Sequence, residues 1–231
     1  DNLEASATLL WRTGKNGYTA MDWYDAPDPR PDYYRNLPSY YWMDDPDYGR
    51  QNAEKAAWAQ YAWEENIPEY AHLNWDRLYN VNWNNLDANG VARSKYVIEE
   101  RRVDQNDINL GANVKWNTTK WFTLTGGINY KWNRTEYYKI LDDLLGGDYW
   151  LDIDQYSERD YPDNPTILQN DLNNPNRKVY VGDKFGYDYD IYANNAKLWG
   201  QFVYQYSFLT FQISPLTALR VLEPRLRSLR A

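Results

Sequence analysis

The chain has 231 residues, a formal net charge of −8, no cysteine and a mean hydropathy of −0.88, although 17% of its residues are aromatic. The negative charge argues against nucleic acid, whose phosphates require a basic face, and the lack of cysteine excludes disulfides and thiolate metal sites. The sequence contains neither the run of about 18 apolar residues that a transmembrane helix needs nor a signal peptide at its start.

The first predicted element is a β-strand near the start of the chain. Apolar residues occupy every second position from Leu3 to Trp11, and polar residues lie between most of them. Such period-2 alternation indicates a strand with one apolar face. A long irregular stretch rich in Asn, Asp, Tyr and Pro follows at 14–95, and the alanines within 51–65 predict a short helix there.

The clearest pattern is a β-hairpin over residues 107–132. Even positions from Ile108 to Trp116 and from Phe122 to Trp132 are mostly apolar, the residues between them are mostly polar, and a polar turn is predicted at 117–120. If the 14–95 connection lies at one end of the strands, this turn must lie at the other. We therefore expect one long strand over 96–116.

The remaining chain is predicted to alternate in the same way. A second irregular stretch is expected at 133–195, with a short helix at 137–145 that ends at Gly146 and Gly147. Strands are predicted at 198–206 and 209–213, with a turn near Ser207. The arginine-rich tail at 214–231 has leucines at near-helical spacing after Pro215, so we expect it to lie outside the sheet as a foreign ending on a truncated reading frame.

Short and long connections therefore alternate along the chain. Long irregular loops are rare in compact soluble domains, whereas bacterial outer-membrane barrels have short periplasmic turns and long extracellular loops. The apolar part of each strand is about the 9–11 residues that cross a bilayer. Trp116 and Trp121 are expected at the lower membrane interface, and Tyr130 and Trp132 at the upper one, as aromatic girdles. The predicted fold class is thus all-β, a transmembrane antiparallel barrel segment with long extracellular loops.

Several longer strings carry a family resemblance. GKNGYTAMDWYDAPDPRPDYYRNLPSYYW at 14–42, YVIEERRVDQND at 96–107 and LLGGDYWLDIDQYSERD at 144–160 resemble TonB-dependent outer-membrane receptors of the Bacteroidetes type, as do NDLNNPNR at 170–177 and GDKFGYDY at 182–189. The resemblance covers most of residues 1–213 and implies that they supply about five strands of a barrel of about 22 strands. The family's N-terminal plug and TonB-contacting segment have no counterpart here, and we expect the chain to be a truncated portion of such a receptor.

This resemblance implies a location in the cell outer membrane and uptake of a nutrient. The implied partners are outer-membrane lipid, the TonB system through the plug region, and a surface lipoprotein; nucleic acid is not among them. The nutrient itself is not identified, and both a glycan and a peptide remain open. A secreted, aromatic-rich β-sandwich that binds carbohydrate is the alternative. Its strands should be spaced by 8–12 residues, which these are not.

Candidate site residues lie in the predicted loops. Aromatic rings that could stack on a sugar or grip a peptide are Trp23, Tyr24, Tyr33, Tyr34, Trp42 and Trp150. Carboxylates that could bind calcium are Asp142, Asp143, Asp148, Asp152 and Asp154, although they lack the EF-hand order of ligands. The single histidine, His72, has no catalytic motif around it and is interpreted as a surface residue, so no enzyme activity is expected.

Overall fold

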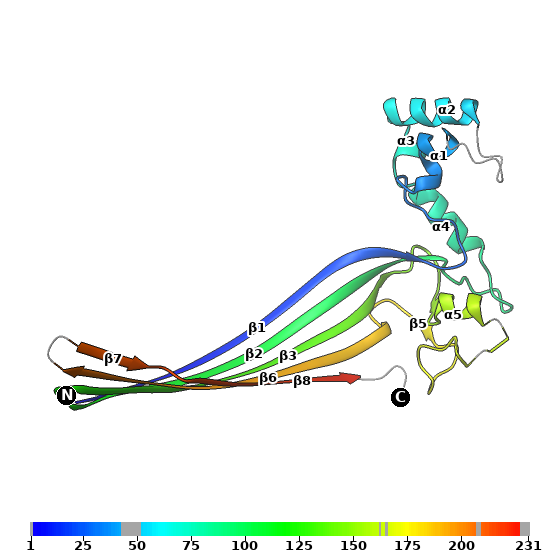
Figure 1. Ribbon diagram of the computed structural model, residues 1–231. Coiled ribbons are helices and arrows are strands. Elements are labelled where there is room, and N and C mark those ends of the chain that lie inside the picture. Colours follow the sequence, from blue (N-terminus) through cyan, green and yellow to red (C-terminus); the bar gives the residue numbers. More distant parts are fainter. Residues whose placement is uncertain (1, 43–51, 162, 165, 207–208, 227–231) are drawn as a thin grey trace.

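The computed structural model describes residues 2–42, 52–161, 163–164, 166–206 and 209–226. About half of the described residues form one long, twisted antiparallel sheet, and the helices gather in a cap at one end of it (Figure 1). The N-terminus and the β2–β3 turn lie at the opposite end. The predicted alternation of long and short connections is therefore present, with the long ones together at the cap.

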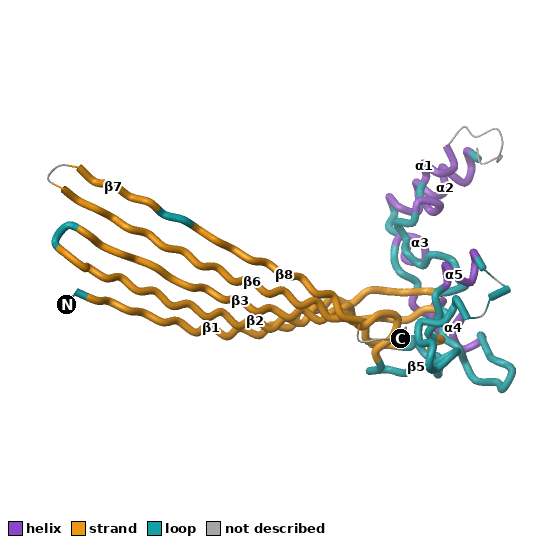
Figure 2. Tube along the Cα trace, turned by 60° about the horizontal axis from the view of Figure 1, so that its bottom comes forward, coloured by secondary structure: helices purple, strands orange, loops and turns teal. Residues whose placement is uncertain are grey.

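The sheet has six strands in the order β1-β2-β3-β6-β7, and β8 also pairs with β6. The strands run side by side in Figure 2 and, except for β7 and β8, are more than 20 residues long. Within the described residues the sheet is open, because β1 pairs only with β2, and β7 and β8 pair only with β6. Their bounds are β1 Leu3–Trp23, β2 Tyr96–Thr119, β3 Phe122–Asp143, β6 Lys184–Tyr206, β7 Leu209–Ile213 and β8 Leu216–Leu226.

The predicted hairpin is confirmed, and its register aligns the apolar positions of both strands. Ile108 pairs with Trp132, and Val114 pairs with Gly126. The turn is shorter than predicted: β2 continues to Thr119, so the polar residues from Asn117 are part of the strand. The hydroxyl of Thr119 accepts a hydrogen bond from the Trp121 backbone N–H (3.3 Å), which stabilises the tight return. The turn expected near Ser207 falls outside the described residues.

The strands extend well beyond the alternating segments, so the irregular stretches are shorter than predicted. β1 runs on to Trp23, and β6 begins at Lys184. The helix predicted at 137–145 is wrong, because β3 continues to Asp143 between β2 and β6. Apart from the residues that join the cap cores, these extensions are mostly polar or charged, so they carry no continuous period-2 hydrophobic signal. Pairing with neighbouring strands decides their structure.

The prediction that the tail lies outside the sheet is also corrected. Residues 216–226 form β8, which pairs antiparallel with β6 from Leu216 opposite Trp199 to Leu226 opposite Tyr189. The leucine spacing predicts a helix, but the edge of β6 offers unpaired backbone N–H and C=O groups alongside residues 216–226. Pairing with this edge makes the segment a strand. Leu229, the last of the spaced leucines, lies outside the described residues.

Two connections build the cap. The first contains η1 Tyr34–Asn36, α1 Pro38–Trp42, α2 Ala53–Glu64, α3 Pro68–Ala71 and α4 Trp75–Asn84. The second contains β4 Trp150–Leu151, α5 Gln155–Asp160 and β5 Lys178–Val179, and β4 pairs with β5. The helix predicted within 51–65 is confirmed as α2, whose N-cap Asn52 accepts from the Lys55 N–H (2.9 Å).

Small cores fix the cap to the end of the sheet. Leu78 of α4 packs with Tyr96 at the start of β2 and Leu145 after β3. A second cluster joins Val97 and Leu141 to Trp150, Val179 and Phe185. Both cores contain residues from the strand ends, so the strands determine where the cap sits.

Among the described residues, no helix combines the length and the hydrophobicity needed to cross a membrane.

Candidate functional site

One face of the sheet is a broad, exposed apolar surface. The strand register places Ala7, Ala112, Ile128 and Leu198 in one row across β1, β2, β3 and β6. Ile128 is 55% exposed and Leu198 is 63% exposed. Neighbouring rows continue the surface, and their exposed large apolar residues include Leu3, Leu9, Leu110, Val114, Leu124, Phe211, Ile213 and Leu219. We call this surface the apolar face.

Aromatic residues border the apolar face at both ends, where the sequence predicts them. Trp116 pairs with Leu124 near the turn, and the Trp121 ring lies 6.1 Å from that of Tyr206. Trp132 lies toward the cap, 6.2 Å from Tyr192. The adjacent Tyr130 hydroxyl hydrogen-bonds the Asn194 side-chain oxygen (2.9 Å). The rows of apolar residues between these two aromatic bands correspond to Leu3–Trp11 on β1.

The opposite face of the same strands is polar. Asn129 donates to Asn109 (2.8 Å) and Thr123 donates to Asn117 (3.0 Å), so these side chains satisfy one another along the sheet. Nearer the cap, the buried Asp107 accepts hydrogen bonds from Arg12 and from Asn133. The predicted division between one apolar and one polar face is thus present in the β2–β3 hairpin, whereas Leu10 of β1 and Leu216 and Leu222 of β8 are exposed on the otherwise polar face.

Beyond the cap-side aromatic band, the apolar face changes into a network of ion pairs. Arg134 pairs with Asp190 (3.1 Å), and Lys184 pairs with Glu136 (2.8 Å). Arg102 joins Glu100 (3.1 Å) and Asp104 (3.2 Å) on the neighbouring strand. Such a density of charge is incompatible with an apolar surrounding unless the charges are paired, as they are here. The aromatic band therefore marks a boundary on this face between an apolar and a charged zone.

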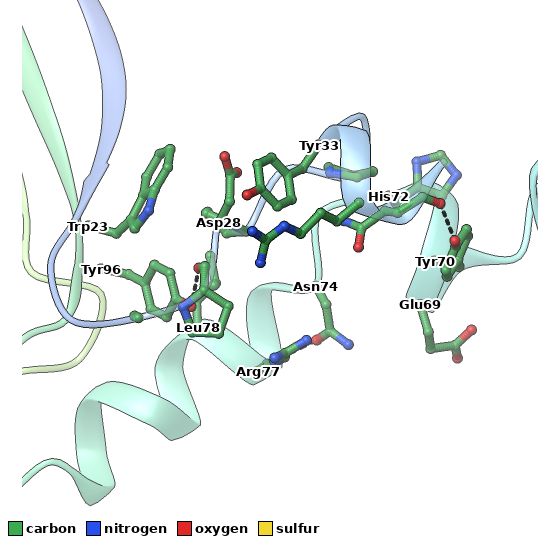
Figure 3. A pocket seen from close by; sticks show the side chains of 16 residues that line it. Trp23, Asp28, Tyr33, Glu69, Tyr70, His72, Asn74, Arg77, Leu78 and Tyr96 are labelled. Atoms are coloured by element: carbon green, nitrogen blue, oxygen red, sulfur yellow. Dashed lines mark hydrogen bonds between the residues drawn. The ribbon is translucent and has the colours of Figure 1, made fainter. Parts of the chain in front are cut away.

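The cap contains a cavity of about 650 Å³ beside the end of β1. Its lining comes from the loop after β1, from α3 and α4, and from the start of β2, as Figure 3 shows. Aromatic rings line it together with charged side chains: Trp23, Tyr33, Tyr70 and Tyr96 with Asp28, Arg35, Glu69, His72 and Arg77. Small-ligand sites combine aromatic rings with polar groups, and this wall contains both, with a larger share of charged side chains.

Hydrogen bonds hold the cavity wall in place. The Tyr96 hydroxyl donates to the Pro27 carbonyl (2.7 Å), and the Tyr70 hydroxyl donates to the Asn36 carbonyl. Arg30 forms a bidentate contact with Asp28. Burial by itself raises the pKa of the Asp28 carboxyl, but the hydrogen bonds from Arg30 outweigh it and leave that pKa lowered. Asp28 is therefore an anion whose charge is offset by Arg30.

Only part of the predicted ligand-binding set lies in this cavity. Trp23 and Tyr33 line it, whereas Tyr34 is 48% exposed and Trp42 is 52% exposed elsewhere in the cap. Trp150 is buried in the second core cluster, and Tyr24 packs against it. Both of these rings also border a small void of about 60 Å³. Their positions are those of packing residues.

Tyr70, Arg77 and Tyr96 also line the cavity, and none of them was predicted from the sequence as a site residue. Nothing in their local sequence distinguishes them from other loop residues. They lie far along the chain from the loop after β1, and only the fold brings them beside it. His72 is exposed, as predicted, and lies at the rim of the cavity.

The five carboxylates proposed to bind calcium make separate contacts and do not form one group. Asp143 and Asp148 accept backbone N–H groups of Leu145 and Ala92 (2.8 Å each), Asp154 caps α5, and Asp142 is exposed on β3. Asp152 is buried with Asn170 (2.9 Å) and Arg177 (2.8 Å). In the described part of the chain, no group of three or more such side chains is arranged to hold a metal ion.

Comparison with protein-family models, with curated proteins and with solved structures gave no match to this chain.

Proposed function

We propose that this chain is part of the β-barrel of an outer-membrane, TonB-dependent receptor that imports a nutrient. The observation that carries the proposal is the exposed apolar face between two aromatic bands, opposite a polar face on the same strands. Soluble proteins rarely expose a contiguous apolar patch of this extent, and such a patch marks contact with a partner or a membrane.

The dimensions of the apolar face support a bilayer as that partner. Its rows correspond to residues 3–11 on β1, and nine residues at about 3.3 Å each extend about 30 Å. A strand tilt of about 35–45° reduces this to about 21–24 Å, close to the apolar band of about 25 Å on outer-membrane barrels. The ion-pair network beyond the cap-side aromatic band then lies in water outside the cell.

The carbohydrate-binding sandwich fits less well. A sandwich must bury the apolar face of one sheet against a second sheet about 10 Å away. The other sheet among the described residues is the pair β4–β5, with two residues in each strand, and it belongs to the cap. The import role and the TonB partner rest on the family resemblance of residues 1–213.

The absence of cysteine from the sequence permits a clean test of the membrane assignment. We would introduce single cysteines as Ile128→Cys on the apolar face and Asn129→Cys on the polar face, attach a nitroxide, and insert the chain into phosphatidylcholine vesicles. We expect the label at 128 to collide mainly with oxygen and the label at 129 mainly with a water-soluble nickel chelate. Equal, water-like accessibility at both positions would contradict the proposal.

A further inference from the structure

The cap cavity has two arginine side chains in its wall. Arg35 and Arg77 both line it, and Arg30 already offsets Asp28, which leaves Glu69 as the opposing carboxylate. Arg77 is exposed at the start of α4, and among the described residues its guanidinium forms no ion pair. An arginine in a cavity wall that has no ion-pair partner is suited to bind a carboxylate, because its guanidinium can donate charge-assisted hydrogen bonds.

The same wall presents aromatic rings whose polar ends are already engaged. The hydroxyls of Tyr96 and Tyr70 donate to backbone carbonyls. The Tyr96 ring is also buried in a core cluster, and the Tyr70 ring packs against Trp58, so these two residues stabilise the wall. Tyr33 and Trp23 add two more rings, and the Arg30 guanidinium lies over the Trp23 ring, 5.5 Å from its centroid. Figure 3 shows Tyr33 in the upper part of the wall and Arg77 in the lower part. Flat rings of this kind stack on other rings or on the apolar faces of sugars.

The backbone of the wall is poorly suited to bind an extended peptide. Pro27, Pro29 and Pro31 have no N–H, and the carbonyl of Pro27 is occupied by Tyr96. Peptide recognition by added strands depends on free backbone donors and acceptors. The prolines also fix the backbone, so the rings and guanidinium groups are held in place before a ligand arrives.

We propose that this cavity binds a carboxylate attached to a ring, with the carboxylate at Arg77 and Arg35 and the ring against Tyr33 and Trp23. Two sources share this chemistry, a uronic-acid sugar and an aromatic acid. The inference rests on the proposed function, because the cap of an import receptor is the surface that first meets the nutrient.

Isothermal titration of the full chain in detergent micelles tests the inference with three probes. Digalacturonate represents the acidic sugar, 4-hydroxybenzoate represents the aromatic acid, and galactobiose is the neutral counterpart of the first. We expect at least one acid to bind, and galactobiose to bind at least about tenfold more weakly than digalacturonate if the sugar is the source. The inference is overturned if neither acid binds at millimolar concentration, or if digalacturonate is the only acid that binds and galactobiose binds equally well.

Arg77→Gln should weaken binding of the acid by about tenfold or more, because a charge-assisted bond is lost. The matched control is Arg159→Gln, which removes the same charge from an exposed residue of α5 outside the cavity lining. Equal effects of the two substitutions would overturn the assignment. Tyr33→Leu should weaken binding as well, with the near-ultraviolet circular dichroism unchanged apart from the lost tyrosine.

The nitroxide experiment separates the two proposals. A lipid-facing label at 128 together with failed binding of both acids would remove only the ligand assignment. A water-exposed label at 128 would remove the receptor proposal whatever the titrations show.

Discussion

At the scale of single residues, Asn82 joins the cap to the sheet. It is fully buried in α4, and its amide nitrogen donates to the carbonyls of Tyr96 (2.8 Å), Leu144 (2.9 Å) and Leu145 (3.0 Å). Its side-chain oxygen accepts from the N–H groups of Lys95 (2.8 Å) and Tyr96. One side chain thus satisfies backbone groups at the start of β2 and after the end of β3.

Asn82→Ala should destabilise the cap by about 3 kcal/mol or more, because several buried backbone groups lose their partners at about 1–3 kcal/mol each. Hydrogen exchange of residues 75–96 measures the effect as a loss of protection. Asn80→Ala is the control, since Asn80 is exposed on the same helix. Similar exchange in the two variants would show that the bridge contributes little.

Asp87 gives the cap a dependence on pH. Its carboxylate accepts the N–H groups of Val91 (3.0 Å) and Asn89 (2.8 Å) and pairs with Lys178 (3.1 Å). These contacts, led by the backbone hydrogen bonds, hold its pKa well below the usual carboxyl range. Because the folded pKa is below the unfolded one, the stabilisation is complete above the unfolded value of about 4 and is lost as the pH falls through the folded pKa.

We therefore expect the turn at 87–91 to lose exchange protection as the pH falls below about 4, after correction for the intrinsic rate. Asp87→Asn should open this turn at neutral pH and reduce the pH dependence. Asp76→Asn, at an exposed position of α4, should leave both unchanged. An acid response that persists undiminished in Asp87→Asn would assign the effect to another group.

At the scale of elements, α2 packs through a strip of alanines. Ala56, Ala59 and Ala62 are each 0% exposed, and the helix lies against α1. These alanines are three residues apart in the sequence, and this spacing places them along one side of the helix. Small side chains allow a close approach, so this contact depends on volume rather than on polarity.

Ala59→Leu should destabilise the packing of α2 by about 1–3 kcal/mol, since a well-packed contact has no room for the added atoms. Ala57→Leu makes the same change on the exposed side and should have little effect. Limited proteolysis of the α1–α2 region compares the two variants. Equal cleavage rates would indicate that the alanine strip tolerates larger residues.

At the scale of the whole molecule, the two faces of the sheet predict its behaviour in lipid. Ile128→Lys places a charge in the middle of the apolar face and should disfavour insertion into vesicles by about 2–4 kcal/mol. Asn129→Lys adds the same charge to the polar face and should change insertion little. Urea titration of the vesicle-inserted chain measures the difference. Equal midpoints for both variants would contradict a lipid-facing role for Ile128.

The sequence by itself determined the two-faced part of the sheet. Wherever one face is apolar and the other polar, as in 108–116 and 122–132, alternation with period 2 sets the strand and its register, because a shift by one residue would exchange the faces. It also located the aromatic bands and α2. The strand over 96–116 was predicted from the position of the turn and is confirmed.

The tertiary structure alone decided the rest. The polar halves of the other long strands, such as 133–143 and 184–195, carry no continuous hydrophobic pattern, and pairing with neighbours makes them strands. The tail forms a strand because the edge of β6 offers it backbone hydrogen bonds. These outweigh the preference for a helix that the spacing of its leucines indicates. The cavity is likewise a product of the fold: Trp23, Arg77 and Tyr96 are distant in sequence and meet only where the strand ends fix the cap.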